Sequence, residues 1–361
     1  MPGTTDAAAV PDGTPSPLPP LTDTYDALYG TQYGVWYRDA RRFAPKTTVV
    51  DVEAVEPTFL DWLDADSLVL GDDGGAGLGR AAKVVELSDD DEAGRGEEGD
   101  DDDDDDDEGI QFPALSAVVR DAVAEYGAVF PKLNWSAPLD ASWIMPGNTL
   151  RCQTPNDVYL LVKSSDFAMK DLGQMRELQA CGREPRPRLE LVLKKWFEMP
   201  KAHEFRVFVR AGHAIAACQR DVTFYEHLQD ADTQARIAAQ LRAFYENEVA
   251  HMPCALADMV FDVYLTRTLE RCFLIDINPW LPRTDPLLWT YDELDEAAPH
   301  PHALRSPIPL RLLTSAAQAS QSMPTYSANM YPADVVEIGS GQDVAAFART
   351  WQETLAQAAA G

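Results

Sequence analysis

The sequence predicts an α+β fold in which helices accompany antiparallel sheets. Three apolar segments, 188–197, 204–210 and 213–221, follow one another with short connections, which is typical of antiparallel strands. Helical spacing of apolar residues marks 113–128 and 231–250 as amphipathic helices. The chain of 361 residues is 45% hydrophobic, which suffices for one large domain or two ordinary ones.

Cysteine usage and the lack of targeting patterns indicate an intracellular protein. The five cysteines are odd in number and form no CxxC pair, which argues against a disulfide framework or a zinc site. The first twenty residues lack a secretory pattern, and no apolar run approaches the length of a membrane span. We therefore expect a soluble, cytoplasmic monomer without a membrane partner.

About half of the formal charge of −29 lies in one segment, and the rest is spread thinly over the chain. Residues 89–108 hold fifteen acidic side chains and one arginine, a contribution of −14, and include eight consecutive aspartates. A strongly acidic protein repels phosphates, so nucleic acid is not an expected partner. Like charges at this density predict a solvated insertion over 71–110. Mimicry of nucleic acid or recruitment of basic partners is the alternative.

The N-terminal third has three further features. Residues 1–20 are rich in Pro, Thr and Ala and predict a disordered tail. Aromatic residues recur at helical spacing over 21–43 and predict a helix that packs on the core. A strand is expected over 47–55 and a short helix over 57–66, so that 21–70 forms the N-terminal part of the fold.

The remainder divides into a core over 111–300 and a C-terminal extension over 301–361 that packs on it. Within the core, the apolar run 158–163 predicts a buried strand ending in Lys163, and a helix follows over 171–181. Gly212 predicts a tight hairpin. The extension is Pro-rich and predicts a helix over 343–357.

Two neighbouring apolar segments, 258–265 and 272–279, contain the residues of greatest chemical interest. Side chains alternate between the faces of a strand, which places Leu274, Asp276 and Asn278 on one face. If Asp262 of the first segment faces the same way, three oxygen ligands converge. This donor set suits Mg²⁺ bound with phosphates. Carboxylates that merely face solvent at a sheet edge are the alternative.

Cations recur at strand positions or strand ends in the same part of the chain. They are Lys163, Lys194, Arg206 and Arg220. Together with the oxygen ligands they indicate a triphosphate held against Mg²⁺. Cross-strand salt bridges, Glu204 with Arg220 for example, are the alternative. The chain has no Walker motif and no GxGxxG after a strand, which favours a nucleotide held between two antiparallel sheets.

Seven motifs in order resemble the cell division cycle protein 123 family. They are FPKLNWSAPLDASW, LLVKSSDF, LVLKKW, EFRVFV, CQRD, VFDVYL and LIDINP. The resemblance implies an ATP-grasp-like fold of two lobes, with antiparallel sheets enclosing ATP and Mg²⁺. It also implies an assembly factor that docks on the gamma subunit of eukaryotic translation initiation factor 2 and promotes its joining with the alpha subunit.

The same resemblance implies roles for individual residues. Lys163 contacts phosphate, and the hinge Val192 to Lys195, which includes Lys194, meets adenine. Arg206, Arg220 and Asp221 line the phosphate and ribose side. The implied Mg²⁺ ligands are Asp262, Asp276 and Asn278. For Lys132 and Trp135, contact with nucleotide, contact with the partner and simple packing all stay open.

Two functions are compatible with these residues. The first is a non-enzymatic, ATP-dependent assembly chaperone, with ATP as a purely structural ligand as a variant of it. The second is an ATP-grasp ligase that forms an acyl phosphate and couples it to an amine. A ligase needs a further pocket with a carboxylate-binding cation, and the sequence offers no unassigned set of residues for it. The chaperone is therefore the expected function.

Overall fold

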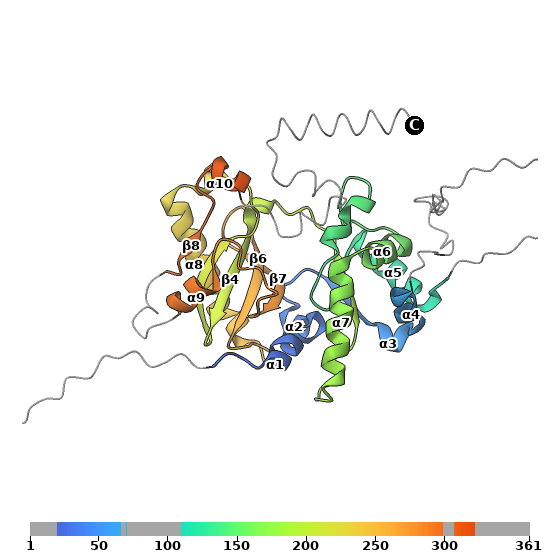
Figure 1. The fold of residues 1–361 in the computed structure, drawn as a ribbon. Coiled ribbons are helices and arrows are strands. Elements are labelled where there is room, and N and C mark those ends of the chain that lie inside the picture. The colour runs from blue at the N-terminus through green and yellow to red at the C-terminus, as the bar shows by residue number, and fades with distance from the viewer. Residues whose placement is uncertain (1–19, 66–69, 71–109, 299–306, 322–361) are drawn as a thin grey trace, which may run out of the picture. The chain divides into compact units, whose positions relative to one another are not determined.

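The structure, a computed structural model, describes residues 20–65, 70, 110–298 and 307–321. The chain divides into two compact units, one formed by Met1–Pro45 with Glu198–Thr325 and the other containing Lys46–Phe197. We call them the five-stranded unit and the three-stranded unit after their sheets (Figure 1). The predicted tail over 1–20, the insertion over 71–110 and the helix over 343–357 lie wholly or almost wholly outside the described residues.

The five-stranded unit is built on a sheet with the order β7-β6-β4-β5-β8. Its strands are β4 (Glu204–Arg210), β5 (His213–Gln219), β6 (Met259–Leu265), β7 (Cys272–Pro279) and β8 (Leu310–Arg311). All neighbours are antiparallel except β8, which runs parallel to β5. Ala211 and Gly212 both have positive φ between β4 and β5, which confirms the predicted hairpin.

The two faces of this sheet have different partners. On one face Phe261 of β6 stacks on Tyr245 of α8 (Ala231–Asn247), with ring centroids 6.0 Å apart. On the other face Phe208 of β4 packs with Trp280 and Trp289 in a buried cluster. This second face also carries the charged residues described below.

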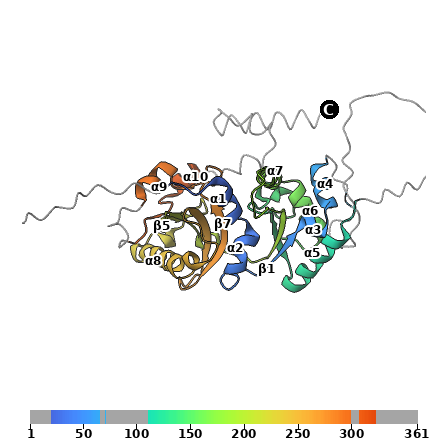
Figure 2. The ribbon, with the colours of Figure 1, turned by 90° about the horizontal axis from the view of Figure 1, so that it is seen from below.

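Short helices complete the five-stranded unit (Figure 2). They are α1 (Thr24–Gly30), α2 (Tyr33–Ala40), α9 (Tyr291–Ala297), α10 (Ala316–Gln321) and the 3-10 helices η2 (Lys201–His203), η3 (Glu226–Leu228) and η4 (Val249–His251). The aromatic segment 21–43 forms two helices where one was expected. Between them the Thr31 hydroxyl donates to the Ala27 carbonyl at 2.8 Å and occupies an acceptor at the end of α1.

The three-stranded unit has an antiparallel sheet with the order β1-β3-β2. The strands are β1 (Thr47–Asp51), β2 (Val129–Lys132) and β3 (Glu190–Lys195). The helices are α3 (Val52–Val55), α4 (Thr58–Asp64), α5 (Pro113–Tyr126), η1 (Leu139–Ile144), α6 (Pro155–Lys163) and α7 (Asp166–Ala180). The expected strand 47–55 stops early because Asp51 accepts a hydrogen bond from the Ala54 amide and starts α3.

The predicted strand over 158–163 is wrong, because this segment belongs to α6. Thr154 and Asp157 form a capping box, and Pro155 occupies the first turn. The buried positions include Val158, Leu161 and Val162, which share one helical face. A short apolar run does not distinguish a strand from a buried helix, whereas the cap residues before it do.

The α+β class with antiparallel sheets is confirmed. The strands predicted around 188–221 and 258–279 are present, as are the helices predicted near 57–66, 113–128, 171–181 and 231–250. None of the helices within the described ranges has both the length and the apolar character needed to cross a membrane.

Candidate functional site

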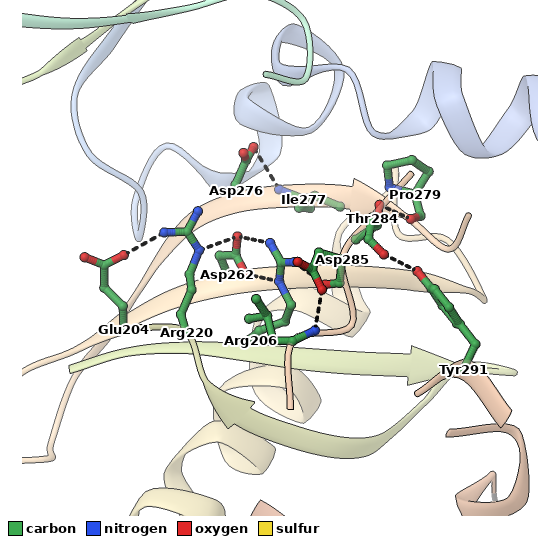
Figure 3. A network of polar contacts seen from close by, with 11 residues as sticks. Glu204, Arg206, Arg220, Asp262, Asp276, Ile277, Pro279, Thr284, Asp285 and Tyr291 are labelled. Atoms are coloured by element: carbon green, nitrogen blue, oxygen red, sulfur yellow. Dashed lines mark hydrogen bonds and ion pairs between the residues drawn. The ribbon is translucent and has the colours of Figure 1, made fainter. Parts of the chain in front are cut away.

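A row of charged residues crosses the centre of the five-stranded sheet. Arg206 of β4 pairs directly with Asp262 of β6, which in turn pairs directly with Asp276 of β7. Residues paired directly across antiparallel strands point to the same face. The sheet therefore brings three residues from distant parts of the sequence together (Figure 3).

Asp262 lies at the centre of this row and is only 1% exposed. Arg206 donates to both of its carboxylate oxygens, from Nε and Nη2, at 2.8 Å each. Arg220, which follows β5, donates from Nε to Oδ2 at 3.1 Å. Burial alone would raise the pKa of Asp262, but the charges and hydrogen bonds of the two arginines outweigh it and lower the pKa to about 2. The carboxylate is therefore ionised at neutral pH.

The two arginines differ in their access to solvent. Arg206 is 7% exposed, and its Nη1 also donates to the Asp285 carbonyl at 2.5 Å. The side chain of Arg220 is 35% exposed and lies between Asp262 and Glu204, whose Oε2 accepts from Nη1 at 3.0 Å. The cross-strand salt bridge considered as an alternative thus exists. Arg206 is a buried partner of Asp262, whereas Arg220 reaches the surface of the site.

A braced loop presents the Asp285 carbonyl to Arg206. The Thr284 hydroxyl donates to the Pro279 carbonyl at 2.7 Å, which ties the loop to the end of β7. The Tyr291 hydroxyl lies 2.7 Å from the Thr284 carbonyl and 2.8 Å from that of Leu281 (Figure 3). Burial raises the pKa of Tyr291 to about 12, so this donor keeps its proton.

The face prediction for β7 is correct for two residues and wrong for the third. The register shifts between Asp262 and Val263, so that Val263 pairs with Leu274 and Ile275 becomes an extra residue of β7. This bulge places Leu274 on the face opposite Asp276. Asp276 and Asn278 follow the bulge in regular alternation and share the face of Asp262.

The donor set of this face fits a magnesium ion held together with phosphates. Asp276 and Asp262 supply carboxylates and Asn278 supplies an amide, which are hard ligands of the kind Mg²⁺ takes. The Asn278 Nδ2 donor is buried without a hydrogen-bond partner among the described residues, and such a donor needs an acceptor, which a phosphate or water oxygen can supply, while the amide oxygen is the atom that can bind Mg²⁺. Within the described ranges, no three His, Cys, Asp or Glu side chains form a metal-binding group. A magnesium site on this face therefore needs Asn278 and phosphate oxygens in addition to the two carboxylates.

Asp221 lies one residue beyond Arg220 and organises the connection that follows β5. Its carboxylate accepts a hydrogen bond from the Tyr225 hydroxyl at 2.7 Å. Burial and this bond raise the pKa of Tyr225 to about 12. The Gln219 side chain donates to the backbone carbonyls of Asp221 and Thr223 at 2.6 and 2.5 Å. Asp221 is thus held in a defined place beside the arginine.

The remaining predicted ligands belong to the three-stranded unit. Lys163 ends α6, and its ammonium donates to the carbonyls of Trp62, Leu63 and Ala65 at the C-terminal end of α4. These bonds use all three N–H groups of the ammonium. The structure therefore gives Lys163 a role in capping α4, with its charge at the favourable end of the helix dipole.

Val192, Lys194 and Lys195 all belong to β3, the central strand of their sheet. Lys194 is buried, with its ammonium 5.6 Å from the centre of the Phe130 ring. The Lys195 ammonium lies 5.4 Å from the centre of the Phe197 ring. The chain passes from one unit to the other between Phe197 and Glu198, directly after this strand.

Comparison with known proteins identifies the family. The model of the D123 family matches residues 36–339. The chain belongs to the D123 family. The "Cell division cycle protein 123" of Candida glabrata is 32% identical over 349 residues, covering 94% of this chain and 95% of the relative. The resemblance inferred from the seven motifs is therefore confirmed.

Two further D123-family comparisons concern a named function and a solved structure. The "Translation initiation factor eIF2 assembly protein" of Schizosaccharomyces pombe is 32% identical over 338 residues, 91% of this chain and 96% of the relative. The structure of C-terminally truncated Cdc123 from the same organism superposes with a TM-score of 0.62 at 30% identity, over 82% of this chain and all of that one.

The motif FPKLNWSAPLDASW of this D123-family chain begins in β2, passes through a braced loop and ends in η1 of the three-stranded unit. Lys132 and Trp135 are both buried. The buried Asp171 of α7 accepts from the amides of Trp135 and Ser136 at 3.0 and 2.6 Å and from the Ser136 hydroxyl at 2.8 Å. Asp171 thus holds the backbone at Trp135, and the Trp135 side chain is buried in this unit. Sequence reasoning missed Asp171, although a carboxylate on the apolar face of a predicted helix is the signal that could have found it.

Proposed function

We propose that this protein is an ATP- and Mg²⁺-binding assembly factor for eukaryotic translation initiation factor 2. The observation that carries the proposal is the name of its relatives. Besides the Schizosaccharomyces pombe relative, the "Translation initiation factor eIF2 assembly protein" of Kluyveromyces lactis is 36% identical over 259 residues, 68% of this chain and 67% of the relative. The family resemblance further implies the gamma subunit as the direct partner.

The charged face of the five-stranded sheet supports nucleotide binding. Arg220 is accessible and oriented by two carboxylates, and a planar guanidinium suits phosphate oxygens. Asp276, Asn278 and Asp262 would hold Mg²⁺, which would neutralise part of the phosphate charge. Asp221 would contact the ribose of ATP, and Arg206 would stabilise the buried carboxylate of Asp262.

For Val192, Lys194 and Lys195 of the three-stranded unit, the support is the resemblance of LVLKKW to the family's motif, and lysine supplies a point charge for phosphate. We leave Lys163 out, because its ammonium is used in capping α4.

A binding assay with the purified gamma subunit tests the proposal. The full chain should retain the gamma subunit in a pull-down, more strongly with MgATP than with EDTA. Arg220→Gln should weaken MgATP binding in calorimetry by at least about tenfold, the equivalent of about 1.4 kcal/mol. Arg242→Gln is the matched control, because Arg242 lies on α8 and pairs with Glu246 at the surface.

Turnover separates an assembly factor from a ligase. ADP release should be absent or far below one turnover per binding cycle, with and without the gamma subunit. If the chain fails to retain the gamma subunit under every condition, the gamma subunit is not its direct partner. Sustained ADP production that requires a small carboxylate would instead establish the ligase.

A further inference from the structure

Asp262 has two incompatible sets of partners. In the structure both of its oxygens accept hydrogen bonds from guanidinium groups. In the proposed function it is a ligand of Mg²⁺. We propose that Asp262 exchanges arginine for Mg²⁺ when nucleotide binds, so that metal and nucleotide must enter together. This inference rests on the proposed function and adds a coupling between its two ligands.

The four charges of the hydrogen-bonded network around Asp262 balance one another, and Asp276 adds a further carboxylate directly opposite Asp262. Arg206 and Arg220 carry two positive charges, and Asp262 and Glu204 carry two negative ones (Figure 3). A carboxylate as deeply buried as Asp262 needs such neutralisation, since an uncompensated buried charge is strongly destabilising. The pairing with guanidinium groups supplies this neutralisation.

Neither ligand alone can replace these pairs well. Mg²⁺ alone would take Oδ2 of Asp262 from Arg220 and place a divalent cation beside a guanidinium group that has lost this carboxylate. ATP without metal would meet Arg220 while Asp262 and Glu204 still hold it, and their negative charges would repel the phosphates. Together, phosphate can take Arg220 while Mg²⁺ takes Oδ2 of Asp262, and Arg206 keeps its bond to Oδ1.

The contacts indicate which arginine moves. Arg206 is anchored by the Asp285 carbonyl as well as by Asp262, and the loop of Asp285 is itself braced by Thr284 and Tyr291. Arg220 has a more exposed side chain and is held by Asp262 through a single bond of 3.1 Å. Arg220 is therefore the group that turns from carboxylate to phosphate.

Calorimetry of ATP in EDTA and of ATP with excess Mg²⁺ tests the exchange in three proteins. In the wild type, MgATP should bind at least about a hundredfold more tightly than metal-free ATP. Asp262→Asn preserves the side-chain volume but removes the charge that restrains Arg220. It should tighten metal-free ATP by at least about tenfold and weaken MgATP, so that the dependence on metal largely disappears.

Glu204→Gln is the matched control, because it removes the same charge from the other side of Arg220 without removing a proposed metal ligand. It should tighten metal-free ATP while leaving the affinity for MgATP undiminished. This variant keeps the Arg206–Asp262 pair, so it also tests the restraint on Arg220 should Asp262→Asn fail to fold.

The outcomes separate the exchange from the proposed function. A wild type that binds ATP in neither condition would refute the proposed function, and the exchange with it. If the wild type binds MgATP but neither variant binds metal-free ATP more tightly than the wild type does, the exchange is overturned and the proposed function stands. Weakening of both forms of ATP by Asp262→Asn would show instead that Asp262 only positions the arginines.

Discussion

Replacing Arg206 by methionine tests whether the buried ion pair holds the five-stranded unit together. Methionine keeps an unbranched stem and removes the guanidinium, so Asp262 retains only the bond from Arg220. Removing one partner of a buried pair costs about 3–5 kcal/mol. Independently, two unit charges about 4 Å apart attract by about 4 kcal/mol at an effective dielectric constant of about 20. We therefore expect Arg206→Met to lower the free energy of unfolding by about 3–5 kcal/mol at pH 7.

A second variant identifies the cause of that loss. Arg206→Met with Asp262→Leu removes both buried charges, so the penalty for an unpaired carboxylate disappears. Apolar replacement of a whole buried pair is often neutral, and we expect the double variant to lie within about 2 kcal/mol of the wild type. Urea unfolding followed by circular dichroism measures all three proteins.

The same pair predicts how stability depends on pH. The pKa of Asp262 falls from 3.8 to about 2 in the folded state, which corresponds to about 2 kcal/mol. Because the folded pKa is the lower one, this stability is present above pH 4 and is lost as the pH falls from 3.8 through about 2. The wild type and Arg206→Met should therefore converge in stability at acid pH. A loss below about 0.5 kcal/mol at pH 7, or a double variant no more stable than the single one, would refute the reasoning.

Three further variants separate structural from ligand-binding roles. Lys163→Met should lower the free energy of unfolding by about 1–3 kcal/mol, because the end of α4 loses its cap, while calorimetry shows unchanged MgATP affinity; a tenfold weaker affinity at unchanged stability would return Lys163 to the phosphate site. Asp276→Ala should abolish the gain in ATP affinity that Mg²⁺ provides, and an unchanged gain in calorimetry would remove Asp276 from the metal ligands. Deleting residues 89–108 should leave the melting temperature and ATP affinity unchanged, because Leu70 and Ile110 form a bridge that joins the two flanks of the segment; a lost site would show that the acidic run supports the fold.

Six of the eight strands in the described residues could be predicted from sequence because their apolar residues alternate or form short runs beside clear turns, whereas β2 and the two-residue β8 were not predicted. Gly212 is an example, since its positive φ is the property for which a hairpin turn selects glycine. The segment 158–163 could not be assigned in this way. Its apolar run fits either structure, and the deciding signal was the capping box at Thr154 and Asp157, outside the run.

The sequence allowed the charged residues of the candidate site to be identified, but it did not show which of them form ion pairs with one another. Arg206, Asp262 and Asp276 were identified because charged residues in apolar strands are costly unless they have partners. Which partner each one takes depends on register, and register is a tertiary property. The Asp285 carbonyl, which fixes Arg206, comes from an irregular loop whose side chains give no hint of a backbone acceptor.

The bulge at Ile275 shows why register matters for chemistry. A regular ladder that pairs Val263 with Leu274 would pair Asp262 with Ile275, and Asp276 would face the opposite side of the sheet from Asp262. The extra residue moves Asp276 into direct register with Asp262 and leaves Leu274 buried on the other face. Two carboxylates directly opposite each other repel, and the arginines beside Asp262 offset that repulsion when no cation is present. The bulge therefore brings together the acidic pair of the proposed Mg²⁺ site, and the guanidinium groups offset the repulsion within that pair.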